Sequence, residues 1–349
     1  MGNGYLLNPE NWTLLQGVAV FGLCALVIAI AGTRITRIVD QLADRTGIGE
    51  AAAGAVLLGA TTSLGGSVLS VTAAWNGNAD LALSNALGGI AVQTFFLAVA
   101  DMVYRRANLE HAAASAPNMM QNALLIMLLS LILMTPLLPN VTIWNIHPVT
   151  PLLFLVYVYG ITLVHRAHHA PMWAPTQTRE TREDKPDDIS EMPPMVRLVS
   201  EFFVLFVVLG FAGYLLEPSA SVIAAETGLT HTVVGVMLTA ISTSTPELVT
   251  SVAAVRRGAL TLAVGGIIGG NAFDTLFTAA SDIAYRNGSI YHSMTDDILF
   301  WLCLTLLMSA VLLMGLIRRE RQGPGRIGLE SLLITLLYMG GVWLMFSQV

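Results

Sequence analysis

The chain has 349 residues, of which 54% are apolar and only 11% are charged, and its mean hydropathy is +0.68. This balance excludes an ordinary soluble domain, in which about a quarter of the residues are charged. The net charge of -6 does not indicate a nucleic-acid partner, because the basic residues lie in short connections between apolar segments and not along one stripe. The composition predicts an integral, multi-pass membrane protein with no nucleic-acid partner.

Apolar segments long enough to cross a bilayer, about 20 residues each, recur from one end of the chain to the other. A polar, proline-containing linker at residues 166–197 separates a first half, 1–165, from a second half, 198–349. We predict ten transmembrane helices, at residues 13–31, 51–74, 79–101, 120–138, 149–165, 198–216, 232–255, 259–284, 298–317 and 327–346.

The basic residues predict how the chain is oriented, because short connections rich in Lys and Arg stay on the cytoplasmic side. If the N-terminus is outside, every Lys and Arg except Arg286 falls in a cytoplasmic segment. With ten helices the C-terminus is then outside as well. The compact form, without a large regulatory loop, favours a prokaryotic plasma membrane. The sequence does not indicate an oligomeric state.

The chain contains an internal repeat. Residues 46–105 and 227–286 align without a gap, and more than a third of the aligned positions are identical. Because an odd number of predicted helices separates the two copies, they enter the membrane in opposite directions. We therefore predict an all-α membrane protein of ten transmembrane helices, arranged as two inverted five-helix repeats. Such folds usually place their substrate site near the membrane midplane, on helices interrupted by Gly or Pro.

The second repeat carries acidic and other oxygen-bearing side chains inside the predicted membrane. Glu247 is a carboxylate in the seventh predicted helix, where an ionisable residue is a functional candidate by default. Thr243 and Ser244 precede it by four and three residues, which places both hydroxyls on its face of a helix. Asn271 and Asp274, three apart in the eighth predicted helix, add an amide and a second carboxylate. Such hard oxygen donors suit Ca²⁺, Mg²⁺ and Na⁺, whereas zinc and copper favour His or Cys.

These segments resemble the alpha-repeats of the sodium/calcium exchanger (cation/Ca²⁺ antiporter) superfamily, whose pattern is roughly Gly-Thr-Ser-Leu-Pro-Glu followed by Gly-Asn-x-x-Gly-Ser-Asn-x-x-Asn/Asp. The matching stretches are Thr243-Ser244-Thr245-Pro246-Glu247 and Gly269-Gly270-Asn271-Ala272-Phe273-Asp274. The resemblance implies a secondary antiporter that binds cations at its centre and exposes them alternately to each side. Inorganic cations would be its substrates, and no cofactor is implied.

The first repeat departs from this pattern. By alignment, Gly66 replaces the glutamate, Ile90 replaces an asparagine, and Gln93 stands opposite Asp274. The resemblance therefore implies two acidic ligands from the second half, and mainly hydroxyl, amide and backbone oxygens from the first. The predicted cation ligands are Glu247, Asp274, Asn271, Thr243, Ser244, Thr62, Ser63 and Gln93.

Two carboxylates are enough for a mechanism, because one Ca²⁺ or two monovalent ions would each neutralise them. Exchange is then predicted to be electroneutral. Moving the empty, doubly charged site through the membrane core would cost about 2.5 to 3.5 kcal/mol per charge, so the occupied site moves more easily. The absence of a glutamate at Gly66 favours coupling to protons or to fewer sodium ions.

Ca²⁺ exchange for Na⁺ or H⁺ is the preferred reading, and two alternatives remain open. A monovalent-cation or Mg²⁺ exchanger fits if the missing carboxylate marks a change of substrate. A cation-binding sensor or scaffold that does not transport fits the loss of Glu and Asn from one repeat. An enzyme is not predicted, because no nucleophile–base pair or catalytic metal set appears. Asp101 and Asp282, which correspond across the repeats at helix ends, are predicted to have a structural or interfacial role.

Overall fold

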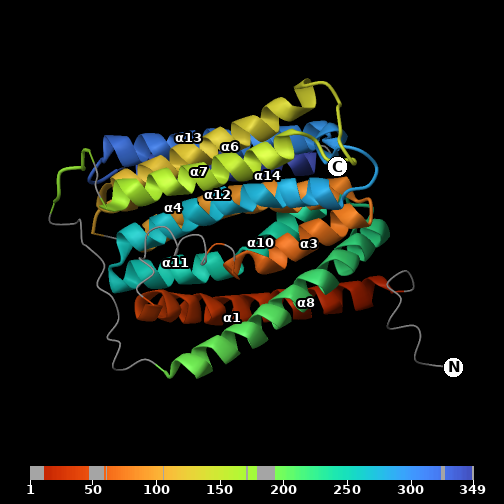
Figure 1. Ribbon diagram of the computed structural model, residues 1–349, viewed down its shortest axis with the longest axis horizontal. Coiled ribbons are helices and arrows are strands. Elements are labelled where there is room, and N and C mark those ends of the chain that lie inside the picture. Colours follow the sequence, from red (N-terminus) through yellow and green to blue (C-terminus); the bar gives the residue numbers. More distant parts are fainter. Residues whose placement is uncertain are drawn as a thin grey trace.

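The computed structural model describes residues 12–46, 59, 61–104, 106–169, 172–178, 193–323 and 327–347. Its helices lie side by side in an elongated bundle (Figure 1). The helical segments are α1 (Leu14–Thr46), α3 (Leu64–Trp75), α4 (Ala79–Val103), α5 (Leu109–Ala112), α6 (Ala116–Met134), η3 (Thr135–Leu137), α7 (Val149–His169), α8 (Met195–Thr227), α9 (His231–Val234), η5 (Gly235–Thr239), α10 (Ala240–Thr243), α11 (Thr245–Arg257), α12 (Leu260–Ala284), η6 (Ile290–Ser293), α13 (Asp296–Arg318) and α14 (Leu329–Ser347).

Eight of the described helices are long and apolar enough to cross a bilayer. A ninth candidate is the pair His231–Thr243 and Thr245–Arg257, which bends by 44° at its break. The helix α3 is apolar but has only 12 residues. Most of the predicted second span before it, residues 51–58 and 60, lies outside the described residues. The chain is thus a multi-pass, all-helical membrane protein.

Two helices are longer than the sequence predicted. The apolar stretches 13–31 and 198–216 belong to α1 and α8, which have 33 residues each. The first helix continues past the predicted span because its extension packs on the bundle through the buried Ile35, Ile38 and Val39. In the same extension the Arg34 guanidinium donates to Glu201 of α8 at 2.6 Å. Hydropathy marks the apolar part of a helix, not its end.

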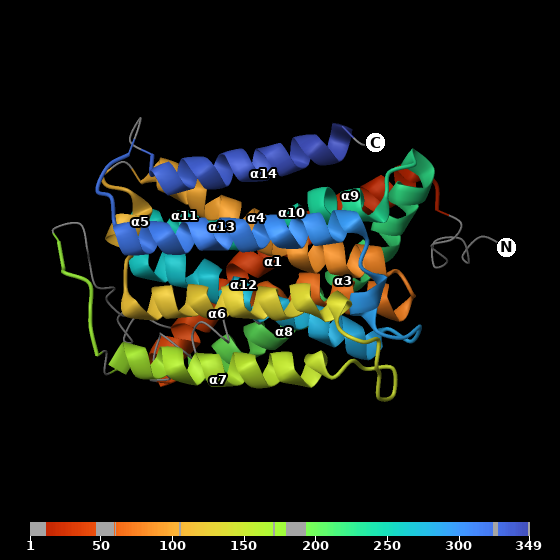
Figure 2. The same cartoon turned by 90° about the horizontal axis from the view of Figure 1, so that it is seen from above.

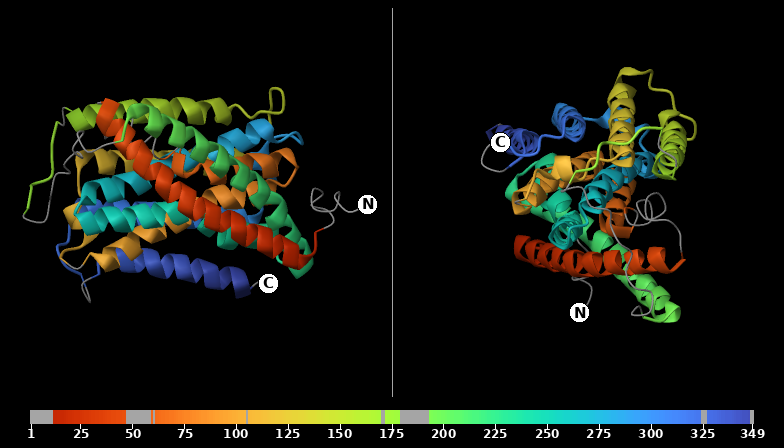
Figure 3. Two further views of the ribbon diagram at one scale, coloured as in Figure 1. Left: turned by 90° about the horizontal axis from the view of Figure 1, so that it is seen from below. Right: turned by 90° about the vertical axis from the view of Figure 1, so that its left-hand side faces the viewer.

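Two of the long helices, α4 and α12, form the buried centre of the bundle. Most residues of α4 and α12 are buried, whereas α1 and α8 cross one face of the bundle obliquely and are the least buried (Figures 1 and 3). Viewed from above, α14 and α7 form the two outer edges (Figure 2). Apolar side chains such as Ile30 and Phe203 point outward. This distribution fits a lipid solvent, in which buried interfaces favour small and polar residues.

The helix bounds recur at a constant spacing along the chain. The helices α1 and α8 begin at Leu14 and Met195, and α4 and α12 begin at Ala79 and Leu260. Both pairs are 181 residues apart, which is also the offset between the sequence copies that begin at residues 46 and 227. The correspondence therefore reaches beyond the 60 aligned residues of each copy.

Gly213 allows α8 to approach the backbone of α3. A Cβ at this position would overlap the carbonyl oxygen of Gly65 and lie 2.9 Å from its Cα, and a backbone cannot move aside as a flexible side chain can. We expect Gly213→Ala to lower the free energy of unfolding by about 1 to 3 kcal/mol, measured by thermal unfolding in detergent. Gly210→Ala on the same helix is the control, because a Cβ there meets nothing within 4 Å. Equal effects of the two changes would contradict this explanation.

Candidate cation-binding site

Two helix breaks lie at equivalent places in the two halves. The helix α3 begins after a turn at Ser63, and α11 begins after a turn at Ser244. The backbone angles of the two serines are similar, with φ -85° and ψ 7° in one and φ -94° and ψ 1° in the other. Pro246 occupies the first turn of α11, where its missing N–H costs no helical hydrogen bond.

The break corrects one step of the sequence argument. Thr243 ends α10, whereas Glu247 lies in the first turn of α11. The two residues therefore do not share the face of one continuous helix, because the chain bends between them. The serine that hydrogen-bonds to Glu247 comes instead from the other half of the chain.

Glu247 is 5% exposed, and a residue of the first repeat hydrogen-bonds to it. The hydroxyl of Ser63 donates to its Oε1 at 3.2 Å. Its Oε2 is buried and has no hydrogen-bond partner among the described residues. One oxygen of this carboxylate is thus free to bind a cation.

Asp274 is joined to the first half through Gln93, the residue that corresponds to it in the other repeat. The side-chain amide of Gln93 donates to Asp274 Oδ2 at 2.7 Å and to the Ser244 hydroxyl at 3.3 Å. Asp274 is 2% exposed. Gln93 therefore connects the second carboxylate to the serine at the helix break.

The remaining predicted ligands are buried near these groups. Asn271 donates to the Thr94 hydroxyl of α4 at 3.0 Å. Thr62 and Thr243 donate their hydroxyl protons to backbone carbonyls of the preceding helical turn, at 3.3 and 2.9 Å. The hydroxyl oxygen of Thr243 thus keeps lone pairs for a cation.

The region carries two acidic side chains and, among the described residues, no basic side chain paired with either of them. Within the described residues, neither Glu247 nor Asp274 takes part in an ion pair, and no group of three or more His, Cys, Asp or Glu side chains could hold a metal. Two buried negative charges without a partner are costly. A cation or proton must balance them. The buried side-chain oxygens with no donor among the described residues include Glu247 Oε2, Asp274 Oδ1, Gln93 Oε1, Asn271 Oδ1 and Asn85 Oδ1.

Asn85 is a buried polar residue that the sequence reasoning missed. It lies in α4, is 2% exposed, and donates to the Gly66 carbonyl at 3.1 Å and to the Ser70 hydroxyl at 2.9 Å. A Cβ at Gly66 would lie 3.6 Å from the Asn85 amide nitrogen and 3.4 Å from the Thr243 hydroxyl. The Asn85 amide therefore occupies space beside Gly66 into which a glutamate side chain would extend.

The repeat alignment holds a signal for Asn85. The first repeat has Gly66 and Asn85 where the second has Glu247 and Gly266. In the first repeat the large polar side chain, Asn85, lies on α4 and the glycine on α3. In the second repeat the large polar side chain, Glu247, lies on α11 and the glycine on α12. The signal for Asn85 therefore lies in the two pairs of positions taken together, and not in the acidic positions alone.

Known proteins are similar to this chain in sequence and in fold. Residues 16–166 and 198–347 match the family described as sodium/calcium exchanger protein. The putative antiporter CaxA of Alkalimonas amylolytica is 26% identical over 333 residues, which are 94% of this chain and 98% of that protein.

Two solved structures have the same fold. The sodium-calcium exchanger NCX_Mj aligns with a TM-score of 0.63 at 15% identity, over 95% of this chain and 99% of that one. The H⁺/Ca²⁺ exchanger CAX aligns with a TM-score of 0.69 at 14% identity, over 95% and 85% of the two chains. Because the family match covers most of both halves, the chain belongs to the sodium/calcium exchanger family.

Proposed function

We propose that this protein is a secondary active antiporter that exchanges Ca²⁺ for Na⁺ or H⁺ at a site formed by Glu247 and Asp274. The observation that carries the proposal is the pair of buried carboxylates, each with one oxygen that lacks a partner among the described residues. Ser63 binds Glu247 and Gln93 binds Asp274, so both acids are connected to the first half. The family to which the chain belongs consists of transporters, which supports the same conclusion.

The contacts between the halves suit alternating access. The ligands come from both repeats, so a relative movement of the two repeats would open the site to one side and close it to the other. A bound Ca²⁺, or two monovalent ions, would balance the charges of the two acids. The movement is then cheaper for the loaded site than for the empty one.

We propose that Asn85 Oδ1 is a neutral ligand that substitutes for the missing glutamate at Gly66. Its burial and its lack of a donor among the described residues support this role. An amide oxygen is a suitable Ca²⁺ ligand and adds no charge. The site then has a charge of -2 and not -3.

The membrane arrangement is part of the proposal. We propose ten spans arranged as two inverted five-helix repeats; the second of these spans, residues 51–74, lies partly outside the described residues. The constant spacing of the helix bounds supports this arrangement. We propose that both termini are outside and that the protein resides in a prokaryotic plasma membrane, on the basis of the basic residues and the compact chain.

The coupling ion can be identified by Ca²⁺ uptake into proteoliposomes under separate Na⁺ and pH gradients, each with the membrane potential clamped. We expect at least one gradient to drive uptake. The rate should not depend on the clamped potential, because equal charge moves in each direction. Uptake that requires Na⁺, ignores the pH gradient and carries net charge would contradict a site with two negative charges.

A further inference from the structure

Asp101 connects three segments at one end of the bundle through hydrogen bonds. It lies near the end of α4 and is fully buried. Its Oδ1 accepts the backbone N–H of Leu109 at 2.6 Å, and its Oδ2 accepts that of Gly328 at 2.8 Å. Gly328 directly precedes α14. The carboxylate thus joins the end of α4 to the start of α14, as its predicted structural role requires.

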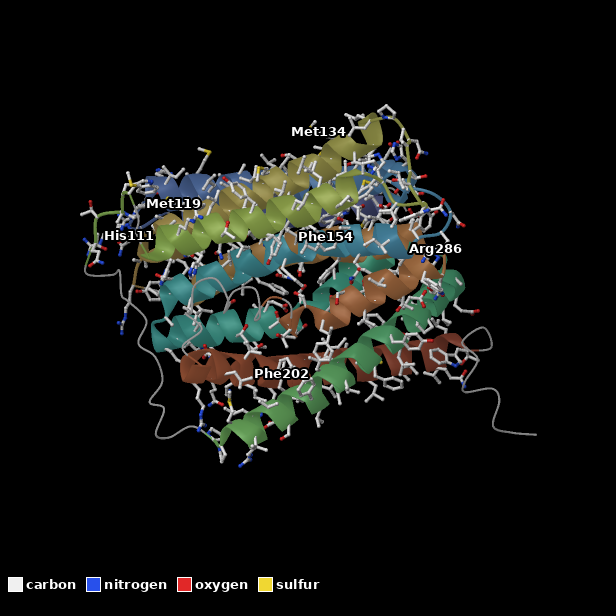
Figure 4. The ribbon with its side chains drawn as sticks, viewed as in Figure 1. His111, Met119, Met134, Phe154, Phe202 and Arg286 are labelled. Atoms are coloured by element: carbon white, nitrogen blue, oxygen red, sulfur yellow. The ribbon has the colours of Figure 1, made fainter. Side chains whose placement is uncertain are left out.

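Asp282 makes the equivalent contacts at the other end of the bundle. Its Oδ1 accepts the N–H of Ile290 at 3.0 Å, and its Oδ2 accepts the N–H of His147 at 2.8 Å. Ile290 and Asp282 each lie 181 residues after Leu109 and Asp101, and Gly328 lies 181 residues after His147. Figure 4 shows the two ends, which His111 and Arg286 mark on opposite sides of the bundle.

The two ends differ at one position. Tyr291 follows Ile290, and its hydroxyl lies 3.0 Å from the Thr150 hydroxyl. At the Asp101 end the equivalent residue is Glu110, whose Oε1 accepts the hydroxyl of Ser331 at 2.6 Å. The Asp282 end therefore has a neutral phenol, Tyr291, at the position where the Asp101 end has a carboxyl group, Glu110.

The second oxygen of Glu110 faces Asp101. Glu110 is 5% exposed, and its Oε2 is buried with no partner among the described residues. A Cβ on Gly328 would lie 2.8 Å from Glu110 Oε2 and 3.4 Å from Asp101 Oδ2. The two carboxylate oxygens therefore converge on the same small space beside Gly328. Two ionised carboxylates repel each other at such close range.

The neighbouring charges do not neutralise this pair. On α14, Glu330 pairs with Arg318 of α13 at 3.2 Å, and Arg318 also pairs with Glu320 at 3.2 Å. His111 is engaged elsewhere, because its Nδ1 lies 2.7 Å from the Arg319 carbonyl oxygen.

The other helix that packs against α5 brings no compensating charge either. The first two turns of α12, residues 260–267, contain no titratable side chain. Burial, and then the charge of Asp101, raise the pKa of Glu110 to about 7.

We propose that Asp101 and Glu110 form a proton-binding site, separate from the cation site, in which one proton is held between Glu110 Oε2 and Asp101 Oδ2. Loss of this proton places two unscreened charges at the joint between α4 and α14. Because α4 also carries Asn85 and Gln93, the proton would regulate ion exchange, a consequence that rests on the proposed function. The binding of the proton itself does not depend on transport.

The pH dependence of stability tests this site without any transport assay. Between pH 4.5, the ordinary pKa of Glu, and about 7, the folded protein binds a proton that the unfolded chain does not. This contribution to stability is therefore present at low pH and is lost as the pH rises to about 7. Glu110→Gln imitates the protonated acid, and its amide can donate to Asp101. The folding constant of the variant relative to wild type should rise about 150-fold from pH 4.5 to 8.

The measurement is thermal unfolding of wild type and Glu110→Gln in detergent at several pH values. The difference between them cancels the titration of Glu247 and of the other acids outside this pair. Tyr291→Phe, at the equivalent position of the opposite end, is the matched control and should differ from wild type equally at all pH values. Parallel profiles of wild type and Glu110→Gln would overturn the proposal.

A second variant keeps the test decisive if Glu110→Gln does not fold. Ser331→Ala removes a hydrogen bond that favours ionised Glu110. It should therefore shift the titration of a protonated carboxyl, followed by its infrared C=O band, to higher pH than in wild type. A wild-type protein without such a band near neutral pH, or a band that Ser331→Ala leaves unchanged, would overturn the proposal.

Discussion

Glu247→Gln is expected to reduce Ca²⁺ transport by about 100-fold or more while the protein still folds. Glutamine keeps the shape of the side chain and can still accept the hydrogen bond from Ser63, but it removes one of the two negative charges of the site. Loss of groups that merely support metal ligands costs about 10- to 100-fold in metal affinity. Loss of a direct, charged ligand should cost at least as much. Ca²⁺ flux in proteoliposomes measures the effect.

Glu217→Gln is the matched control for this experiment. Glu217 is also a buried glutamate inside a transmembrane helix, α8, and is 5% exposed. Its carboxylate accepts hydrogen bonds from Asn76 at 3.1 Å and from Ser221 at 3.3 Å, and it is not among the proposed ligands. We expect near wild-type flux. If both substitutions reduced flux equally, the loss would reflect general damage to buried acids and not the removal of a cation ligand.

Gly66→Glu is expected to abolish Ca²⁺ transport, although it restores the residue that the family pattern has at this position. The Asn85 amide and the Thr243 hydroxyl already lie 3.6 and 3.4 Å from the position of the new Cβ. The longer side chain would clash with them, and overpacking of this kind costs about 1 to 3 kcal/mol. The third carboxylate would also leave a negative charge that one Ca²⁺ does not balance.

Adding Asn85→Gly to Gly66→Glu should restore part of the transport. The pair then has glutamate and glycine in the arrangement of Glu247 and Gly266 in the second repeat. The third carboxylate needs a third positive charge, so transport by the double variant should depend on the membrane potential. Wild-type flux in Gly66→Glu alone, or no gain from adding Asn85→Gly, would contradict the assigned role of Asn85.

The sequence predicted most of the transmembrane helices and the internal repeat, because hydropathy and identity are local signals. The bounds of α4 and α12 differ from prediction by no more than two residues at either end. The ends of α1 and α8 were missed, because both helices continue as mixed polar and apolar segments whose apolar residues, such as Ile38 and Ile223, are buried against the bundle. The sequence also could not predict that residues of the first half, Ser63 and Gln93, hydrogen-bond to Glu247 and Asp274.

The predicted ligand set remains a proposal, but particular residues show where sequence reasoning succeeds and fails. The correspondence of Gln93 with Asp274 pointed to two residues that hydrogen-bond to each other. The spacing of Thr243 and Glu247 misled, since a helix break separates them. Asn85 was missed because nothing in the sequence distinguishes an amide at a cation site from one that only packs; its neighbours in space show the difference.

Uphill Ca²⁺ movement in the wild-type protein tests the central claim most directly. Purified protein in liposomes would be given equal Ca²⁺ on both sides and an opposing Na⁺ or H⁺ gradient. The two-carboxylate exchange site predicts net Ca²⁺ accumulation that ends when the driving gradient is dissipated. Ca²⁺ binding to the purified protein without any gradient-driven flux would contradict the account and would identify the chain as a cation-binding sensor or scaffold.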